Sequence, residues 1–271
     1  MSTTSRTDEP ARVTYAGLAA DDTGGDDRPP LVLLHGLTFD RRIWRPVLDR
    51  IRALDPARRI VAFDLPGHGE SPARPPHDFT RVMAALGAAF DAAHIDEPVL
   101  VGHSMSGGLA SLFGAHHAVT AIVNVDQPPE IAPFAQLLGT LQEQLRGPQF
   151  DEVWRVFADS FHTELLADDV RAFVETNSAP SQSTVLSYWE PLLAQPVDAL
   201  VDEVDRAIGA IADHRTPYVL VVGAPLPADL EARLRARVPQ LRIEDWSPSG
   251  HFPHLAHADR FAALLVAVDG S

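Results

Sequence analysis

The sequence predicts an α/β protein with a doubly wound, mostly parallel sheet and an inserted helical cap. Three observations lead to this prediction. Short apolar runs of strand type alternate with helical patterns, and several of these runs are apolar at every position, as strands covered on both faces are. Between residues 131 and 214 only helical periodicity remains. We therefore divide the chain into a first core segment (12–127), a cap (128–213) and a second core segment (214–271).

The first core segment begins with an edge strand predicted at 13–18, followed by a turn region rich in Asp and Gly at 20–30. Buried strands are predicted at 31–34 and 59–65, and each of them runs into a glycine-containing loop. Helices are predicted where apolar residues recur at helical spacing. The remaining elements, in chain order, are a helix (41–54), a helix (79–94), a strand (99–101) with a helix behind it, and a strand (119–125).

The cap follows Pro128-Pro129 and carries aromatic residues throughout its length. We expect most of them to form the core of the cap and a minority to face a ligand, because pockets and cores use the same apolar side chains. Strand character then returns. The second core segment is predicted to contain a strand (217–222), a helix (228–238), a strand (241–246) and a closing helix (253–268).

A serine stands at the turn between the strand at 99–101 and the helix behind it. The pattern Gly102-His-Ser104-Met-Ser106 places small residues on both sides of Ser104. A serine hydroxyl is a weak nucleophile, so it must project from a sharp turn where a base can reach it. The usual pattern has glycine where Ser106 stands. An ordinary strand-to-helix connection that happens to contain serine remains the alternative at this point.

Two loops complete this edge of the predicted sheet. Gly36 lets the backbone turn beneath a substrate, so the N–H groups of Leu37 and Met105 are the candidate oxyanion donors. We interpret His35 as a hydrogen-bonded brace. In the loop that follows the strand at 59–65, we prefer a structural role for the polar side chains at 64–71 over a metal site at Asp64 and His68.

Composition excludes several classes of function. The net charge of −15 and the pI near 5.1 leave no basic stripe to hold phosphates, so we expect no nucleic-acid partner. Zero cysteines exclude disulfides, thiolate metal sites and a cysteine nucleophile. Residues 1–11 are polar and no apolar run is long enough to cross a membrane, so a cytoplasmic protein without a membrane partner is expected. We expect no cofactor and no metal.

The ordered set His35-Gly36, residues 64–71, residues 102–107 and Gly250-His251-Phe252 resembles the α/β-hydrolase superfamily. The resemblance extends from residue 13 to the end of the chain. It implies the α/β-hydrolase fold, with Ser104 as nucleophile and His251 as general base on the loop after the last strand. A non-hydrolytic role remains open, because the fold does not guarantee hydrolysis.

The acid that would orient His251 departs from the pattern of the superfamily. Most members carry Asp after the strand equivalent to 218–222, but here Leu226 stands at that position. Some branches take the acid from the end of the preceding strand, where this chain has Asp126. Asp229 is the other candidate, although it is placed like a first-turn helix residue. We favour Asp126, whose role would be to hold the tautomer of His251 and stabilise its cation.

Within the superfamily the layout resembles zearalenone-type lactonases. The shared features are an acid after the sixth strand, a Gly223-Ala segment without Asp, a closing Gly-His-Phe-Pro run with a later His-x-Asp-x-Phe, and Trp189 late in the cap. Those enzymes carry Glu where this chain has Asp126. Haloalkane dehalogenases and epoxide hydrolases have a similar layout, but they use aspartate at the position of Ser104.

These observations predict a cofactor-independent serine hydrolase that cleaves a carboxylic ester through an acyl-enzyme, with a zearalenone-like macrolactone as the favoured substrate. A general carboxylesterase, a C–C bond hydrolase and a non-hydrolytic ligand-binding or biosynthetic protein are the alternatives. We expect a small apolar or aromatic ester that contacts Trp189, Trp154 and Gly36. A homodimer is an option for the assembly.

Overall fold

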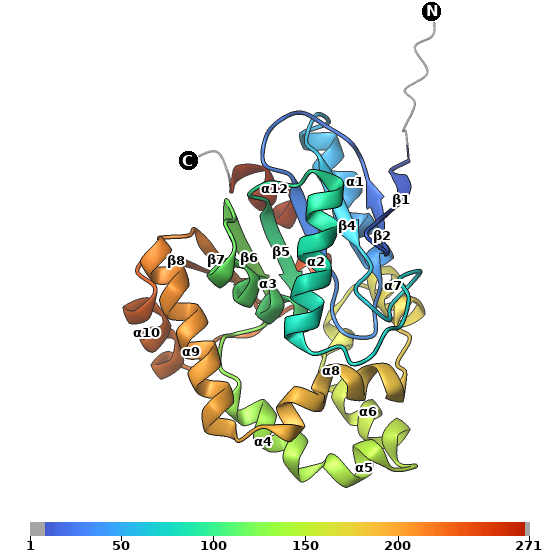
Figure 1. Cartoon of the computed structure of the whole chain (residues 1–271), viewed down its shortest axis with the longest axis vertical. Helices are drawn as coiled ribbons and strands as arrows, with labels where there is room; N and C mark the ends of the chain where they lie inside the picture. The colour runs from blue at the N-terminus through green and yellow to red at the C-terminus, as the bar shows by residue number, and fades with distance from the viewer. Residues whose placement is uncertain (1–8, 269–271) are drawn as a thin grey trace, which may run out of the picture.

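Eight strands form one mixed sheet in the computed structural model, which describes residues 9–268 (Figure 1). In spatial order the strands are β1 (Ala11–Tyr15), β2 (Leu18–Asp22), β4 (Ile60–Phe63), β3 (Leu31–Leu34), β5 (Val99–His103), β6 (Ala121–Val125), β7 (Tyr218–Val222) and β8 (Leu241–Asp245). In this order all neighbours from β4 to β8 are parallel, whereas β2 pairs antiparallel with both β1 and β4. The predicted doubly wound, mostly parallel sheet is thereby confirmed.

Helices cover both faces of this sheet. The side chains of β3 alternate, so that Leu31 and Leu33 pack into one apolar cluster while Val32 and Leu34 pack into the other. One cluster includes α1 (Arg45–Leu54) and α12 (Ala258–Ala267), which pack against each other. The opposite cluster includes α2 (Phe79–Ala93), α3 (Met105–His116), α9 (Val197–His214) and α10 (Ala228–Arg237). Shorter helical segments are η1 (Arg41–Trp44) and α11 (Pro253–Ala256).

Only helices occur between β6 and β7, as the sequence predicts. They gather at one end of the sheet in Figure 1, below the central strands. The last of these helices, α9, lies along α3 and returns the chain to the sheet. The others are α4 (Ala132–Thr140), α5 (Gln142–Arg146), α6 (Phe150–Asp159), η2 (Thr163–Leu165), α7 (Asp168–Asn177) and α8 (Gln182–Ala194).

The predicted turn region at 20–30 is wrong at its beginning, because β2 extends to Asp22. Asp21 and Asp22 discourage a strand prediction, yet both are buried. Arg41 donates to Asp21 across 2.8 Å, and Arg59 donates to Asp22 across 2.7 Å. Arginines distant in sequence therefore compensate the buried charges, and this compensation makes the strand possible.

Several predicted ends shift by one or two residues, the helix predicted at 41–54 is divided into η1 and α1, and two further differences have a visible cause in the backbone. The predicted edge strand at 13–18 is a strand that ends at Tyr15, followed by a two-residue turn at Ala16-Gly17. Both turn residues have positive φ, 48° and 93°, as tight hairpin turns require. The predicted closing helix at 253–268 is divided into α11 and α12, because His257 leaves the helical region with φ −126° and ψ 48°.

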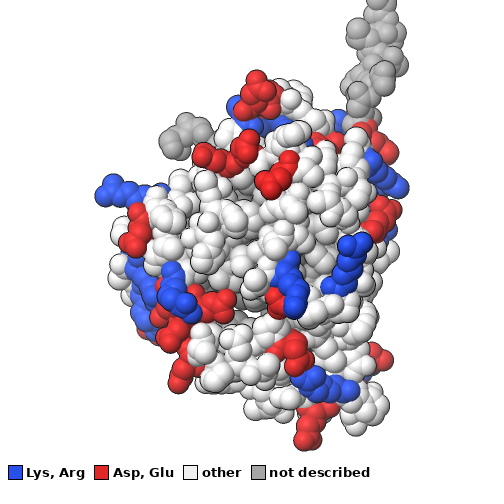
Figure 2. Space-filling view, in the orientation of Figure 1, with Lys and Arg blue, Asp and Glu red and all other residues white. Residues whose placement is uncertain are grey.

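Charged side chains on the face in Figure 2 are interspersed, with arginines beside acidic residues rather than in a stripe. Arg233 illustrates the pattern, since it forms ion pairs with both Asp229 and Glu130. Pairs of this exposed kind contribute little to stability. Within residues 9–268, no helix has both the length and the apolar composition that crossing a bilayer requires.

Candidate active site

Ser104 occupies a strained turn between β5 and α3, at the edge where the parallel strands end. Its backbone has φ 55° and ψ −129°, a conformation that non-glycine residues seldom adopt. Hydrogen bonds hold it from both sides: Ser104 N donates to Val125 O at 2.8 Å, and Gly107 N donates to Ser104 O at 2.7 Å. The predicted nucleophile therefore stands on an anchored turn, as nucleophilic serines of α/β proteins do.

Small residues beside Ser104 make this turn possible. A Cβ on Gly102 would collide with the carbonyl group of Ser106 in the following helix. Ser106 itself is buried inside α3, and its hydroxyl donates to the His35 carbonyl oxygen. Because this position is helical rather than left-handed, it accepts a Cβ where the usual pattern has glycine. The hydrogen bond from Ser106 to His35 O also ties the turn to the loop that carries Gly36.

His251 and Asp126 form a hydrogen-bonded pair beside this turn. His251 lies on the loop between β8 and α11, and its Nδ1 is 2.8 Å from Asp126 Oδ2. Asp126 directly follows β6, and its other oxygen accepts from Gly223 N at 2.9 Å. A carboxylate at this site requires a proton on Nδ1, which leaves Nε2 of the imidazole as an acceptor. That tautomer is the one a general base uses.

The electrostatic surroundings favour an ionised Asp126. Burial raises its pKa, but the hydrogen bond and charge of His251 and the Gly223 N–H lower it more, so the pKa of Asp126 lies below its ordinary value. Asp229, the alternative acid, lies on α10 with its carboxylate exposed and paired with Arg233 at 2.6 Å. Of the two candidates, the structure brings Asp126 to His251.

Two side chains that the sequence analysis did not single out hold the loop of His251. The imidazole of His103 is fully buried, and its Nε2 donates to His251 O at 2.8 Å. From the other side, Phe161 stacks on the His251 ring with centroids 4.8 Å apart, and Phe161 O accepts from His251 N at 2.9 Å. The candidate base is therefore fixed by one residue of the core and one of the cap.

The predicted oxyanion donors, Leu37 and Met105, line the same cavity as Ser104 and His251. Met105 is the first residue of α3, where backbone N–H groups lack a carbonyl partner within the helix. Gly36 is not part of the cavity wall. A Cβ there would lie 3.0 Å from His103 Nδ1 and 3.3 Å from Ser104 Cβ. Glycine at this position therefore leaves room for the serine turn.

The loops behind Leu37 are braced by polar side chains, as the sequence suggests. His35 Nδ1 donates to Gly36 O at 2.8 Å, while its Nε2 accepts from Leu65 N at 3.0 Å. Asp64 accepts from the backbone N–H groups of Arg41 and Glu70 at 2.7 and 2.8 Å. Across the described part of the chain, no group of three His, Asp or Glu side chains is arranged to bind a metal ion.

Buried histidines in this region give a testable pH dependence. Burial lowers the pKa of His35 to about 4 and the pKa values of His68 and His103 to about 3. Histidine in an unfolded chain has a pKa of about 6.5. Below that pH the unfolded chain therefore binds protons that the folded chain does not bind. We expect the free energy of unfolding to fall as the pH drops from about 6.5 towards 4, by up to about 1.4 kcal/mol per pH unit for each histidine that stays neutral in the folded protein.

Urea unfolding at a series of pH values measures this slope. The His68→Gln variant removes one titrating group, so we expect its slope to be shallower by up to about 1.4 kcal/mol per pH unit. Glutamine can still accept from Thr38 N and donate to Pro66 O, the two partners of the His68 ring. An unchanged slope in the variant would show that this histidine does not stay neutral in the folded protein.

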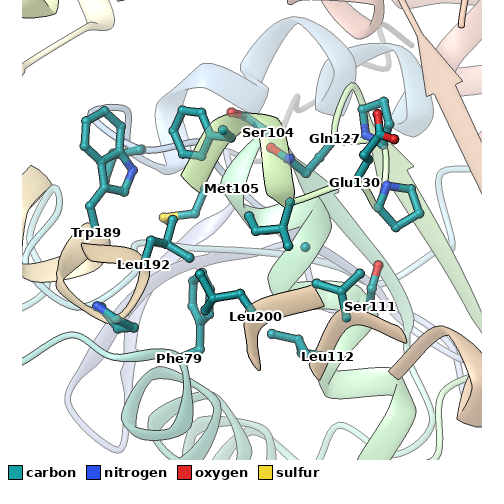
Figure 3. Close-up of a pocket in the computed structure, with 18 of the residues that line it drawn as sticks. Phe79, Ser104, Met105, Ser111, Leu112, Gln127, Glu130, Trp189, Leu192 and Leu200 are labelled. Carbon is teal, nitrogen blue, oxygen red and sulfur yellow. The ribbon is translucent and has the colours of Figure 1, made fainter. Parts of the chain in front are cut away.

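The cavity beside Ser104 has a volume of about 710 Å³ and is formed by the core and the cap together (Figure 3). Trp189 and Trp154, the two predicted cap contacts, both line it, with their rings 6.0 Å apart. Trp189 is at the centre of an aromatic group. Its ring lies 5.3 Å from Phe157 and 5.5 Å from Phe134. A cavity of this size and lining accommodates a small apolar molecule.

Comparisons with known proteins agree with this architecture. A model of the alpha/beta hydrolase family matches residues 31–264. The pimeloyl-[acyl-carrier protein] methyl ester esterase of Xanthomonas campestris pv. campestris (strain B100) is 30% identical over 265 residues, covering 88% of this chain and 93% of the relative. The 2-succinyl-6-hydroxy-2,4-cyclohexadiene-1-carboxylate synthase of Serratia proteamaculans (strain 568) is 28% identical over 271 residues, covering 89% of this chain and 93% of the relative.

The structural likeness extends across nearly the whole chain. The crystal structure of the enol-lactonase from Burkholderia xenovorans LB400 matches with a TM-score of 0.70 at 16% identity, covering 95% of this chain and 99% of that one. At this identity the likeness shows the fold alone. The family model, by contrast, spans most of the sequence, including both core segments and the intervening helices. The chain therefore belongs to the alpha/beta hydrolase family.

Proposed function

We propose that this protein is a serine hydrolase that cleaves carboxylic esters, with a lactone as its favoured substrate. The observation that carries the proposal is the arrangement around one cavity: Ser104 on an anchored turn, and His251 bonded to Asp126 at 2.8 Å. A hydroxyl and a neutral imidazole oriented by a carboxylate are the parts that acyl transfer through a covalent intermediate needs.

The proposed reaction proceeds in two halves. Ser104 Oγ attacks the acyl carbon while His251 Nε2 takes the hydroxyl proton, and the N–H groups of Leu37 and Met105 stabilise the oxyanion. The protonated His251 then gives its proton to the alkoxide as the ester C–O bond breaks; an open ester releases this alcohol, whereas in a lactone it stays joined to the acyl-enzyme as the far end of the opened ring. In the second half His251 takes a proton from water, the resulting hydroxide attacks the acyl carbon, and Ser104 leaves with the returned proton.

A lactone is favoured over an open ester because of features shared with zearalenone-type lactonases. These are the acid after β6, the Gly223-Ala segment without Asp, and Trp189 in the cap. The aromatic lining of the cavity suits a bulky apolar or aromatic substrate. The cytoplasm, expected from composition alone, is the proposed place of this activity.

One observation favours a second candidate. The relative from Serratia is named a synthase, so a family member about as similar to this chain as the esterase is named for another reaction. A non-hydrolytic reaction would use the same His251–Asp126 pair as base without requiring an acyl-enzyme on Ser104. Product analysis distinguishes the two candidates.

The test is mass analysis of zearalenone, simpler lactones and open esters after incubation with wild-type and Ser104→Ala protein. Gain of one water by the macrolactone, dependent on Ser104, is the expected result. Cleavage of simple esters alone would replace the lactonase by a general carboxylesterase, and cleavage of a carbon–carbon bond would identify a C–C hydrolase. Absence of any Ser104-dependent product would contradict the serine hydrolase altogether.

A further inference from the structure

The cavity extends in two directions from Ser104, and the two ends differ in chemistry. In Figure 3 Trp189 lies on one side of Ser104 and Met105, whereas Gln127, Glu130 and Ser111 lie on the other. The first side is aromatic. We define the polar end as the side chains of Ser111, Gln127 and Glu130 together with Asn124, whose Nδ2 donates to Gln127 O, and Glu203 of α9, which lines the same cavity.

We propose that the polar end is a subsite for a hydrogen-bond donor on the substrate, a hydroxyl or an ammonium group. The inference rests on the proposed ester hydrolysis and adds a substrate class to it. It predicts that the favoured ester has an apolar, aromatic part on one side of the cleaved bond. The other part carries the donor.

A buried chain of hydrogen bonds fixes what Ser111 offers to a ligand. Its Oγ is 2.8 Å from Gly107 O, which can only accept, so the Ser111 proton points to that carbonyl. Tyr218 Oη, 2.9 Å away, must then donate to Ser111, while it accepts from Asn124 Nδ2 at 2.8 Å. Ser111 is only 5% exposed and lines the cavity. The oxygen that it presents there is therefore an acceptor without a proton to give.

The neighbouring groups are also rich in acceptors. Asn124 uses both Nδ2 protons, one for Tyr218 Oη and one for Gln127 O, so the orientation of its amide is fixed. Within residues 9–268 the side chains of Gln127 and Glu203 have no hydrogen-bond partner, which leaves them available to a ligand. Glu130 accepts from Arg233 at 2.7 Å through one carboxylate oxygen, and its other oxygen remains available to a ligand.

Charge narrows the ligand class further. Among the described residues that line the cavity there is no arginine or lysine, whereas three carboxylates, those of Asp78, Glu130 and Glu203, are present. A carboxylate on the ligand would meet these like charges, and the cation beside Glu130, Arg233, is already paired with Glu130 and Asp229, so this arrangement disfavours it. A neutral hydroxyl or a cationic ammonium group can donate to Ser111 Oγ, to the carboxylate oxygens and to the amide oxygen of Gln127.

Gly108 keeps the approach to the polar end open. It lies one helical turn after Ser104 on α3, and the nearest atom to a Cβ placed there would be Gln127 Cγ, at 3.9 Å. A leucine at this position would extend beyond that Cβ into the cavity. The Gly108→Leu variant is therefore a steric probe that leaves the hydrogen-bonding side chains unchanged.

The experiment compares matched esters that carry a phenyl group on one side of the ester bond and a short chain on the other. The chain ends in hydroxyl, ammonium, methyl or carboxylate, and both orientations of the ester are tried. For the wild-type protein we expect kcat/KM to be about tenfold higher for the hydroxyl-ended or ammonium-ended ester than for the methyl-ended one, since a lost hydrogen bond to a buried acceptor has about this effect. The carboxylate-ended ester is expected to react most slowly.

Variants assign the preference to the polar end. Gln127→Met and Glu203→Gln are expected to reduce the preference for hydroxyl or ammonium, and Gly108→Leu to abolish it. Asp202→Asn is the matched control, because Asp202 neighbours Glu203 on α9 but is exposed and does not line the cavity. This control should keep the wild-type ratio.

Two outcomes would overturn the subsite: equal kcat/KM for hydroxyl-ended and methyl-ended esters in the wild type, or a preference that survives in Gln127→Met, Glu203→Gln and Gly108→Leu alike. If no ester is hydrolysed, the proposed function fails, and calorimetric binding of the same compounds to the Ser104→Ala protein still decides the subsite. Hydroxyl-ended and ammonium-ended compounds should then bind more tightly than methyl-ended ones, and equal affinities would contradict the subsite.

Discussion

Replacing Asp126 by asparagine should lower kcat for ester hydrolysis by about 10⁴-fold. The carboxylate accepts the Nδ1 proton of His251 at 2.8 Å and faces the cation that forms when Nε2 takes a proton from Ser104. An asparagine amide can donate to Nδ1 instead, which would place the imidazole proton on Nε2 and remove the base. Steady-state kinetics with a chromogenic ester measures the effect.

The matched control is Asp229→Asn, which changes the other candidate acid. Asp229 is exposed and paired with Arg233, so this variant should hydrolyse the same ester at the wild-type rate. Thermal unfolding of both variants separates loss of fold from loss of catalysis. Near wild-type hydrolysis by Asp126→Asn together with inactivity of a folded Asp229→Asn would show that the acid is wrongly assigned.

Replacing Ser104 by alanine should reduce hydrolysis by about 10⁴- to 10⁶-fold. Without the hydroxyl no acyl-enzyme forms, and only the oxyanion donors and the binding cavity remain to accelerate attack by water. Ser183→Ala is a suitable control, because Ser183 is exposed on α8 and does not line the cavity. The kcat of both variants, measured on the same ester, gives the comparison.

The buried parallel strands of this fold are readable from sequence, but β2, the second strand from the edge, is not. Residues 31–34 are apolar at every position and form β3, buried on both faces. β2 escapes this reasoning, because Asp21 and Asp22 resemble turn residues. Their partners, Arg41 and Arg59, are distant in the sequence, and only the folded chain brings them within hydrogen-bond distance. Local propensity does not register such a tertiary contact.

The candidate site also contains residues that the sequence predicts and residues that only the structure identifies. Ser104 and His251 belong to short motifs, and the position of Leu226 directs attention to Asp126, which the structure then places beside His251. His103 and Phe161 could not be identified as braces of His251 from the sequence, because a buried histidine and a cap phenylalanine resemble core residues there. Their contacts with His251 exist only after the cap and the core have packed.

The central claim is that Ser104 carries the acyl group during turnover. The most direct test is mass spectrometry of the intact protein and of its peptides. The wild-type protein is mixed with an excess of an ester that it hydrolyses, and the reaction is quenched rapidly with acid during turnover. We predict an adduct with the mass of the acyl group on the peptide that contains Ser104, absent from the Ser104→Ala variant. Turnover that continues unchanged in Ser104→Ala, with no acyl adduct on the wild-type peptide, would contradict the account.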